Sequence, residues 1–452
     1  MPESQGKFQY LAQGGAVAQE GACRVRFDAQ TLTLSPATGA ALVFDLGDLD
    51  AVTAADWEVR LPLYTGRTIV LRQLGKAYDT FAHDLLEAYR NRTVQCLLLE
   101  DLGELARFNG NFEVTSADSQ APQAGVAEIR VYKSNLAVLP VAARSFQWRL
   151  ADIDEVTLDA AEYQVVLRTG DQRLKVTRLA RRTEEFSAAV NEAVNALATQ
   201  SAEALHAMMP FLDPDQLQSC ARLLREGRSA PLVKLAAIHK QIPVALAKNA
   251  VDKDLRPYYD QLAARAAGGM GYAGFKLIRP EDSDGLAGQG TAAGAEDSNG
   301  GADDAADAPD ADASAPETLY WFLFPLAAKA GGSALANVVA WEASSRSGRA
   351  TYFFRLVDPT RSSELSDPAK ATSIVDSAVR RLNLVLAMLN FRRRPIYLSD
   401  DELAMDPRFH RYAIAARRMP EVREVRASFL GRALHSSLEA WQAQVESILA
   451  KP

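Results

Sequence analysis

The stretch LVFDLGDLDAV, residues 42–52, recurs as FQWRLADIDEV at residues 146–156. Both copies open with alternating apolar residues, which is the period of a half-buried strand. A Leu follows, and then two Asp residues that enclose one aliphatic residue. Short acidic side chains at a strand end favour a turn, because they accept hydrogen bonds from nearby backbone. The recurrence of strand and turn therefore predicts a duplicated β domain.

The flanks of this stretch match as well, at an offset of 104 to 106 residues. In each copy further alternating segments lie on both sides, and a segment with apolar residues at i, i+4 and i+8 comes last, which predicts six or seven strands and one helix. Asp79 and Thr183 are expected to cap the two helices. The matched apolar residues before and after the repeated stretch are Val25, Phe27, Leu32, Leu34, Val59 and Leu61 in the first copy and Ile129, Val131, Leu136, Val138, Val165 and Leu167 in the second.

Two aromatic pairs test this alignment. Trp57 and Tyr163 are expected at equivalent buried strand positions. Phe81 and Phe186 are expected at equivalent buried positions on the two helices. Residues 1–22 are interpreted as a short extended lead-in to the first copy.

The order of strands closed by one helix resembles the pleckstrin-homology-like (PH-like) superfold, in particular the bacterial PH and GRAM-type domains. Such domains carry an apolar strand that leads into a Leu-x-Asp-Ile-x-x-Val-like turn, and they end in a capping helix. The resemblance covers residues 22–95 and 126–198. It implies an α+β protein with two tandem PH-like domains, each a β-barrel or sandwich closed by its C-terminal helix.

The remaining chain changes its period. Residues 201–267 have helical spacing, with Asp213-Pro214 as a start signal. Further strands and a helix from Ala369 to Asn390 are compatible with a third, diverged PH-like copy, and a last helix is expected from Val425 to Ala450. The expected divisions are 1–98 and 99–199 for the PH-like domains, 200–267 for a helical spacer, 268–280 with 318–366 for the β region of a C-terminal domain, 281–317 for an insert, and 367–452 for an Arg-rich helical region.

The insert from Glu281 to Glu317 holds eleven of the 57 acidic residues and no Lys or Arg. It consists largely of Ala, Gly, Asp and Ser, and it has too little apolar surface to offset the entropy of ordering. We expect it to be disordered. The net charge of −7 therefore belongs to this segment more than to the folded surface.

Composition indicates an ordinary globular protein, with 48% hydrophobic and 24% charged residues. Three cysteines, far apart and odd in number, argue against a disulfide framework and fit a reducing cytoplasm. The first residues lack the pattern of a secretory signal, and no apolar run approaches the length that crosses a bilayer. The sequence therefore predicts a cytoplasmic protein.

No stretch predicts chemistry. Gly269-x-Gly271-x-x-Gly274 matches the dinucleotide fingerprint in letters only, because a helix is expected before it and a strand after it. The five histidines have no metal-ligand spacing around them, and the paired aspartates are interpreted as turn residues. The sequence predicts no catalytic residue, no cofactor and no metal site.

The candidate binding residues are arginines. The runs Arg392-Arg393-Arg394 and Arg417-Arg418 could contact a partner or an anion, although acids interspersed among them favour solvated helix faces. Phosphoinositide binding has little support, because the loop Ser35–Gly39 is uncharged and the second copy offers Arg144 alone, near Lys133. The expected function is a non-enzymatic scaffold or adaptor that binds proteins of unknown identity through its PH-like domains. The alternative is a peripheral protein that binds anionic lipid or nucleic acid, and an enzyme of unrecognised family comes third.

Overall fold

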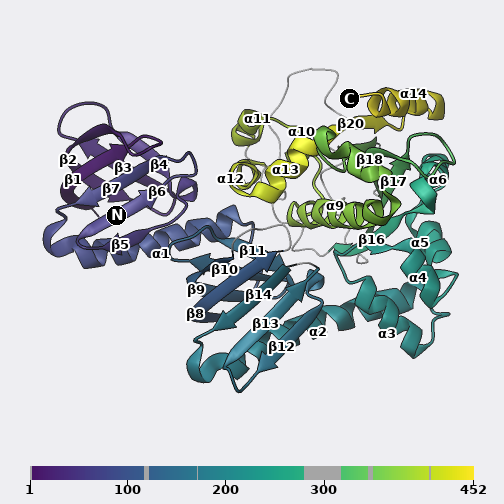
Figure 1. Ribbon diagram of the computed structural model, residues 1–452, viewed down its shortest axis with the longest axis horizontal. Coiled ribbons are helices and arrows are strands. Elements are labelled where there is room, and N and C mark those ends of the chain that lie inside the picture. Colours follow the sequence, from purple (N-terminus) through teal and green to yellow (C-terminus); the bar gives the residue numbers. More distant parts are fainter. Residues whose placement is uncertain are drawn as a thin grey trace, which may run out of the picture. The chain divides into compact units, whose positions relative to one another are not determined.

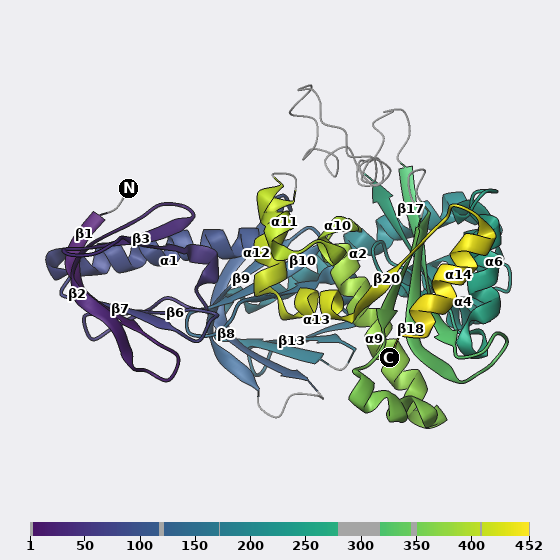
Figure 2. The same cartoon turned by 90° about the horizontal axis from the view of Figure 1, so that it is seen from above.

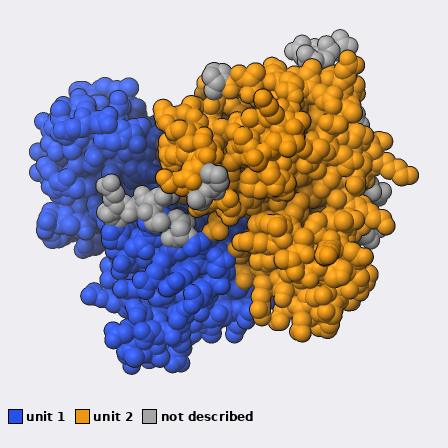
Figure 3. All heavy atoms as spheres, turned by 45° about the vertical axis from the view of Figure 1, so that its right-hand side comes forward, with its two compact units in different colours: residues 1–195, 414–419 blue, residues 196–413, 420–452 orange. Residues whose placement is uncertain are grey.

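The computed structural model describes residues 3–116, 122–170, 172–278, 317–344, 350–406 and 409–451. The chain forms two compact units (Figure 3). Unit 1 comprises Met1–Asn195 together with Ile414–Met419, and unit 2 comprises Ala196–Ala413 and Pro420–Pro452.

Unit 1 contains the two repeats, and each is a seven-stranded antiparallel sheet followed by a helix (Figure 1). The first sheet has the order β4-β3-β2-β1-β7-β6-β5, so that the first strand pairs with the last. A sheet of antiparallel strands followed by one helix agrees with the arrangement that the resemblance to PH-like domains implies. The elements are β1 (Glu3–Leu11), β2 (Val17–Phe27), β3 (Thr31–Pro36), β4 (Leu42–Asp45), the short 3-10 turn η1 (Leu46–Asp48), β5 (Thr53–Ala55), β6 (Glu58–Pro62), β7 (Thr68–Arg72), η2 (Gly75–Ala77) and α1 (Tyr78–Cys96).

The second sheet repeats this topology element by element, in the order β11-β10-β9-β8-β14-β13-β12. The duplication predicted from the two stretches is therefore confirmed, and the repeated Asp-x-Asp turns begin at the last residues of η1 and η3. The elements are β8 (Glu104–Ser116), β9 (Gln123–Tyr132), β10 (Asn135–Pro140), β11 (Phe146–Arg149), η3 (Leu150–Asp152), β12 (Glu155–Asp159), β13 (Gln164–Thr169), β14 (Gln172–Thr177), η4 (Ala180–Arg182) and α2 (Thr183–Met208).

The lead-in expected over residues 1–22 is an integral part of the first sheet. β1 pairs with both β2 and β7, and it places Phe8 in the core with 1% exposure. The equivalent β8 escaped the sequence analysis. Both strands are mostly polar on one face, so their periodicity is weak, and pairing on both sides stabilises them instead.

The capping helices pack as expected. α1 lies across the first sheet (Figures 1 and 2), where Phe81 is buried and meets Phe27 edge to face at 5.2 Å. In the second repeat Phe186 is fully buried and meets Phe108 at the same centroid distance. Each aromatic pair joins the helix to its own sheet and closes the core.

Trp57 and Tyr163 are equivalent but not buried, so this prediction was wrong in part. Each residue immediately precedes the strand expected to contain it, and Trp57 is 68% and Tyr163 64% exposed. Both have positive φ, 61° and 50°. Trp57 lies in the two-residue turn between β5 and β6, whose twist favours positive φ, and Tyr163 is the last residue of the four-residue connection between β12 and β13.

The predicted caps differ by a few positions. α1 begins at Tyr78, so Asp79 lies in its first turn, where a negative charge is favourable to the helix dipole. Thr183 is the first residue of α2, and its hydroxyl donates to the carbonyl of Ala180. Asp213 is the N-cap of α3 (Pro214–Leu223) as predicted, with a reciprocal capping box to Gln216.

Unit 2 joins a helical region to a six-stranded sheet in the order β15-β16-β17-β18-β19-β20. The first five strands are β15 (Ala230–Pro231), β16 (Tyr272–Ile278), β17 (Glu317–Ala327), β18 (Leu335–Ser344) and β19 (Ala350–Arg355). The helices before β17 are α4 (Leu232–Ile238), α5 (Ile242–Ala250), α6 (Arg256–Arg265) and η5 (Ala267–Gly269). Those that follow β19 are η6 (Pro359–Ser366), α9 (Pro368–Met388), α10 (Arg394–Tyr397), α11 (Asp400–Met405), α12 (His410–Arg418), α13 (Pro420–Ser428) and α14 (Leu438–Leu449).

This third sheet does not have the strand order of the repeats. Over the described residues it is a meander, completed by β20 (Phe429–Leu434), a strand that comes after most of the helices. The hypothesis of a third PH-like copy therefore finds no match in the topology.

The long last helix predicted from Val425 to Ala450 was wrong, because β20 interrupts it. β20 pairs with β19, and Gly431, opposite Phe353, has a φ of 143°. A new helix then starts at Ser437, whose side chain accepts a hydrogen bond from the backbone of Ala440. The residue spacing of this segment is helical, but pairing with the open edge of the sheet stabilises a strand instead.

Most of the acidic insert, residues 281–316, lies outside the described residues, and β17 begins at Glu317. Among the described helices, none combines the length and the apolar character needed to span a bilayer.

Candidate docking site on the first repeat

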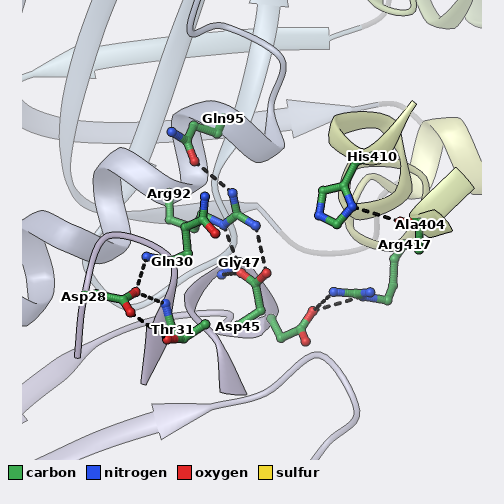
Figure 4. A network of polar contacts seen from close by, with 11 residues as sticks. Asp28, Gln30, Thr31, Asp45, Gly47, Arg92, Gln95, Ala404, His410 and Arg417 are labelled. Atoms are coloured by element: carbon green, nitrogen blue, oxygen red, sulfur yellow. Dashed lines mark hydrogen bonds and ion pairs between the residues drawn. The ribbon is translucent and has the colours of Figure 1, made fainter. Parts of the chain in front are cut away.

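The repeated turn of the first copy is built around Asp45. Its side chain accepts a hydrogen bond from the backbone N–H of Gly47 at 2.7 Å and so caps η1. Arg92, one turn from the end of α1, donates to both carboxylate oxygens of Asp45 at 3.0 and 2.7 Å (Figure 4). Such a two-point contact has a defined geometry and fixes the end of β4 to the helix.

Two arginines at the end of α12 contact the acids that follow in this turn. Arg417 donates through Nε and Nη2 to one oxygen of Asp48, at 3.0 and 2.6 Å. Arg418 donates through Nη2 to the carbonyl of Leu49 at 3.0 Å and to Asp50 at 2.8 Å. These contacts lie within unit 1, to which Ile414–Met419 belongs.

An aromatic ring and a glycine complete the surface. The guanidinium carbons of Arg417 and Arg418 lie 5.7 and 5.3 Å from the ring centroid of Tyr64, which is the range of cation–π attraction. A Cβ on Gly47 would lie 3.3 Å from Cγ2 of Ile414. The absence of a side chain at Gly47 therefore lets the docked segment approach the turn closely.

The charges at this surface depend on one another. Burial raises the pKa of Asp48, and the guanidinium of Arg417 opposes that rise. Burial acts to lower the pKa of Arg417, but the charge and hydrogen bonds of Asp48 outweigh it, so that the pKa of Arg417 is raised. Behind the turn, burial raises the pKa of the Cys96 thiol to about 12, and the thiol is therefore neutral. The ionised Asp48 is partly desolvated and relies on Arg417 for compensation.

In the second repeat, different residues hold the equivalent turn. Arg149 takes the place of Asp45 and donates to Asp152 at 3.4 Å. Asp154 accepts from the backbone of Gly170 at 2.9 Å. Ala151 stands where the first repeat has Gly47. The turn from Thr169 to Gln172, which matches the loop of Tyr64, contains no aromatic residue. Each of these differences disfavours a docked arginine.

Of the other predicted arginines, the run Arg392–Arg394 lies elsewhere, whereas Arg144 lies near the same acidic turn. Arg393 is buried, with its guanidinium 5.9 Å from the ring centroid of Tyr352, and Arg394 lies 5.6 Å from that of Phe409. Arg392 directly precedes them and is half-buried. Arg144, considered for lipid headgroups, lies 3.6 Å from Asp50. The structure therefore brings Arg417, Arg418 and Arg144 to one acidic turn, and it places Arg393 and Arg394 near aromatic rings of unit 2.

One histidine takes part in a buried polar cluster. His435, which follows β20, has its Nε2 3.3 Å from Glu342 and 3.0 Å from the hydroxyl of Thr351, and its ring stacks on Tyr258. These residues are far apart in sequence, so spacing could not reveal the cluster. Over the described residues no group of three or more potential ligands is arranged to hold a metal ion.

The glycine-rich passage has a packing role. A Cβ on Gly274, in β16, would lie 2.2 Å from Cζ2 of Trp321. Helix α6 precedes the passage and a strand follows it, as expected. This glycine makes room for the indole in the core.

Comparison with known proteins adds little. No protein-family model and no curated protein matches the chain. Among solved structures it is similar to the N-terminally truncated linker-DH/PH domains of p115-RhoGEF, with 10% identity, a TM-score of 0.17 and coverage of 27% of this chain and 47% of that one. The chain thus spans about half the length of that structure. It is also similar to a protein of unknown function from the DUF3598 family of Nostoc punctiforme PCC 73102, with 10% identity, a TM-score of 0.14 and coverage of 38% and 72%. At these scores neither similarity bears on function, and the fold rests on the strand order described above.

Proposed function

We propose that this protein is a non-enzymatic scaffold or adaptor that binds protein partners, with the first PH-like repeat as a binding module. The observation that carries the proposal is the docking of Ile414–Met419 on that repeat through Arg417 and Arg418. This docking supports the proposal that a surface of the first repeat is suited to binding a helical segment of a protein. The second repeat has the same fold and lacks these features, so the fold itself does not require them.

The test is a binding experiment with the full chain. The tagged protein is used as bait in extract of its native cell, and retained proteins are cross-linked and identified by mass spectrometry. We expect one or more proteins to be enriched over an unrelated tagged control, with cross-links to residues of unit 1. Enrichment of no protein would contradict the proposal.

The alternative of an anionic-surface binder is tested in the same preparation. Arg417 and Arg418 already face carboxylates, so phosphates would have to displace Asp48 and Asp50. We expect the variant Arg392→Gln/Arg393→Gln/Arg394→Gln to leave any interaction with duplex DNA or phosphatidylserine vesicles unchanged. Tight binding by the wild type, with a salt dependence that falls by about one unit of slope per lost contact in the variant, would favour the alternative.

A further inference from the structure

We propose that the acidic turn of the first repeat recognises a helix with two adjacent arginines on a protein partner, and that the chain's own Ile414–Met419 segment occupies this site as a competing internal ligand. This inference rests on the proposed function and specifies its partner. The site is defined by Asp48, the carbonyl of Leu49, Asp50, Tyr64 and Gly47.

The contacts select arginine over lysine. Arg417 uses two nitrogens of one guanidinium on Asp48, and Arg418 uses one nitrogen to bridge the carbonyl of Leu49 and the carboxylate of Asp50. Both guanidiniums also lie near the ring of Tyr64. A lysine ammonium is a compact charge that lacks this planar fork, so it cannot reproduce the same set of contacts.

The spacing of the docked residues specifies a helix. Ile414 precedes Arg417 by three positions and Arg418 by four, and such residues lie on one face of a helix. Ile414 approaches Gly47 while the arginines reach the acids beyond it. Arginines in the last turn of a helix also interact favourably with its dipole. The required ligand is therefore an apolar residue followed, after two positions, by an arginine pair at a helix C-terminus.

The internal ligand is suited to displacement. The side chains of Arg417 and Asp48 are 32% and 22% exposed, so water and salt weaken their attraction. Arg418 is 9% exposed, and over the described residues its Nη1 has no hydrogen-bond acceptor. Leaving a buried donor unsatisfied is unfavourable. A partner that supplies an acceptor to this nitrogen would compete with the internal segment.

The experiment uses a labelled peptide with the sequence of residues 409–419, FHRYAIAARRM, and the full chain, with fluorescence anisotropy as the readout. We expect weak binding to the wild type, whose site is occupied. In the variant Arg417→Gln/Arg418→Gln the site is vacated, and apparent affinity should rise about ten- to hundredfold if the internal segment occupies it 90 to 99% of the time.

Matched controls assign the binding to the turn. In the vacated chain, adding Asp48→Asn/Asp50→Asn should abolish binding, and adding Tyr64→Ala, which leaves the turn intact, should weaken it. Adding Asp152→Asn/Asp154→Asn, the equivalent change in the second repeat, should leave it unchanged. A peptide with both arginines replaced by lysine should bind at least about tenfold more weakly.

Two results would overturn the inference: binding that is indifferent to Asp48→Asn/Asp50→Asn and Tyr64→Ala, or an affinity that does not rise when the internal arginines are removed. Sedimentation of the wild type measures its oligomeric state and so tests whether a second copy of the chain occupies the site. A dimer that dissociates in Arg417→Gln/Arg418→Gln would assign the site to a second copy of the chain. If cell extract yields partners while the peptide results fail, only this inference falls. If the peptide binds as expected and no partner is retained, the proposed function falls.

Discussion

Replacing Gly47 by Ala tests the architecture of the acidic turn directly. The new Cβ would lie 2.6 Å from Sγ of Cys96, 2.9 Å from Oδ1 of Asp45 and 3.3 Å from Ile414, where ordinary contacts are 3.4–4 Å. Neither of the first two atoms can move freely. Cys96 is buried, and Asp45 is held by Arg92 and by the backbone of Gly47. The φ of Gly47 is not positive, so the cost arises from crowding and not from backbone conformation.

Overpacking of this kind costs about 1–3 kcal/mol. For a folding unit of this size, a loss of about 2 kcal/mol lowers the melting temperature by about 4–8 °C. The assay is chemical and thermal unfolding of the full chain, followed by near-UV circular dichroism. Because the clash is chiefly with sulfur, Cys96→Ala should relieve it, and the double variant should show a favourable coupling of about 0.5–3 kcal/mol.

The second repeat supplies the control for Gly47→Ala. Ala151 already occupies the equivalent place with 3% exposure, so a methyl group is compatible with the turn itself. An unchanged free energy of unfolding in Gly47→Ala, or a double variant with no coupling to Cys96, would refute the reasoning. It would show that the turn adjusts without resistance.

Three further predictions concern core packing, capping and pH. Phe186→Ala should destabilise the protein by about 3–5 kcal/mol in denaturant titrations, because the side chain is fully buried, and a change near zero would contradict its role as core. Asp213→Ala should cost about 1 kcal/mol by the same measurement, because it removes the capping box, while Asp213→Asn should retain most of the stability. Binding of the 409–419 peptide to the vacated site should weaken as the pH falls into the range in which Asp48 takes up a proton. Burial raises the pKa of Asp48 above its ordinary value of about 3.9, so Asp48 loses its charge earlier than an exposed aspartate, and a pH profile unchanged by Asp48→Asn would exclude this origin.

The duplicated sheets could be predicted because their signals are local. The alternation of Leu42 and Phe44 and the Asp-x-Asp turn lie within a few residues of one another, and so do the equivalent signals of the second copy. Trp57 was misplaced because alternation does not reveal a positive φ at the start of a strand. A helix was predicted where β20 lies, because the pairing of β20 with β19 is a long-range interaction that overrides the helical spacing of the local sequence.

The candidate site could be predicted only in fragments. Arg417 and Arg418 stood out as a charged pair, and Asp48 and Asp50 stood out by repetition. Their association could not be inferred, because 369 positions separate Arg417 from Asp48. The departures of the second copy, Arg149 and Ala151, were visible in the alignment of the repeats. Their significance becomes clear only from the structure, in which the end of the docked helix lies beside the turn that contains Asp45 and Gly47.

The assignment of Ile414–Met419 to unit 1 has a consequence for biosynthesis. Domains generally fold as units during translation, the N-terminal one first, at about 5–20 residues per second. Asp48 is therefore synthesised roughly 20 to 70 seconds before Arg417, given the 369 positions between them. Once the nascent first repeat has emerged and folded, it presents its acidic turn without its internal ligand for the remainder of that interval. An arginine-bearing partner present at the ribosome would meet the site before the chain itself could fill it.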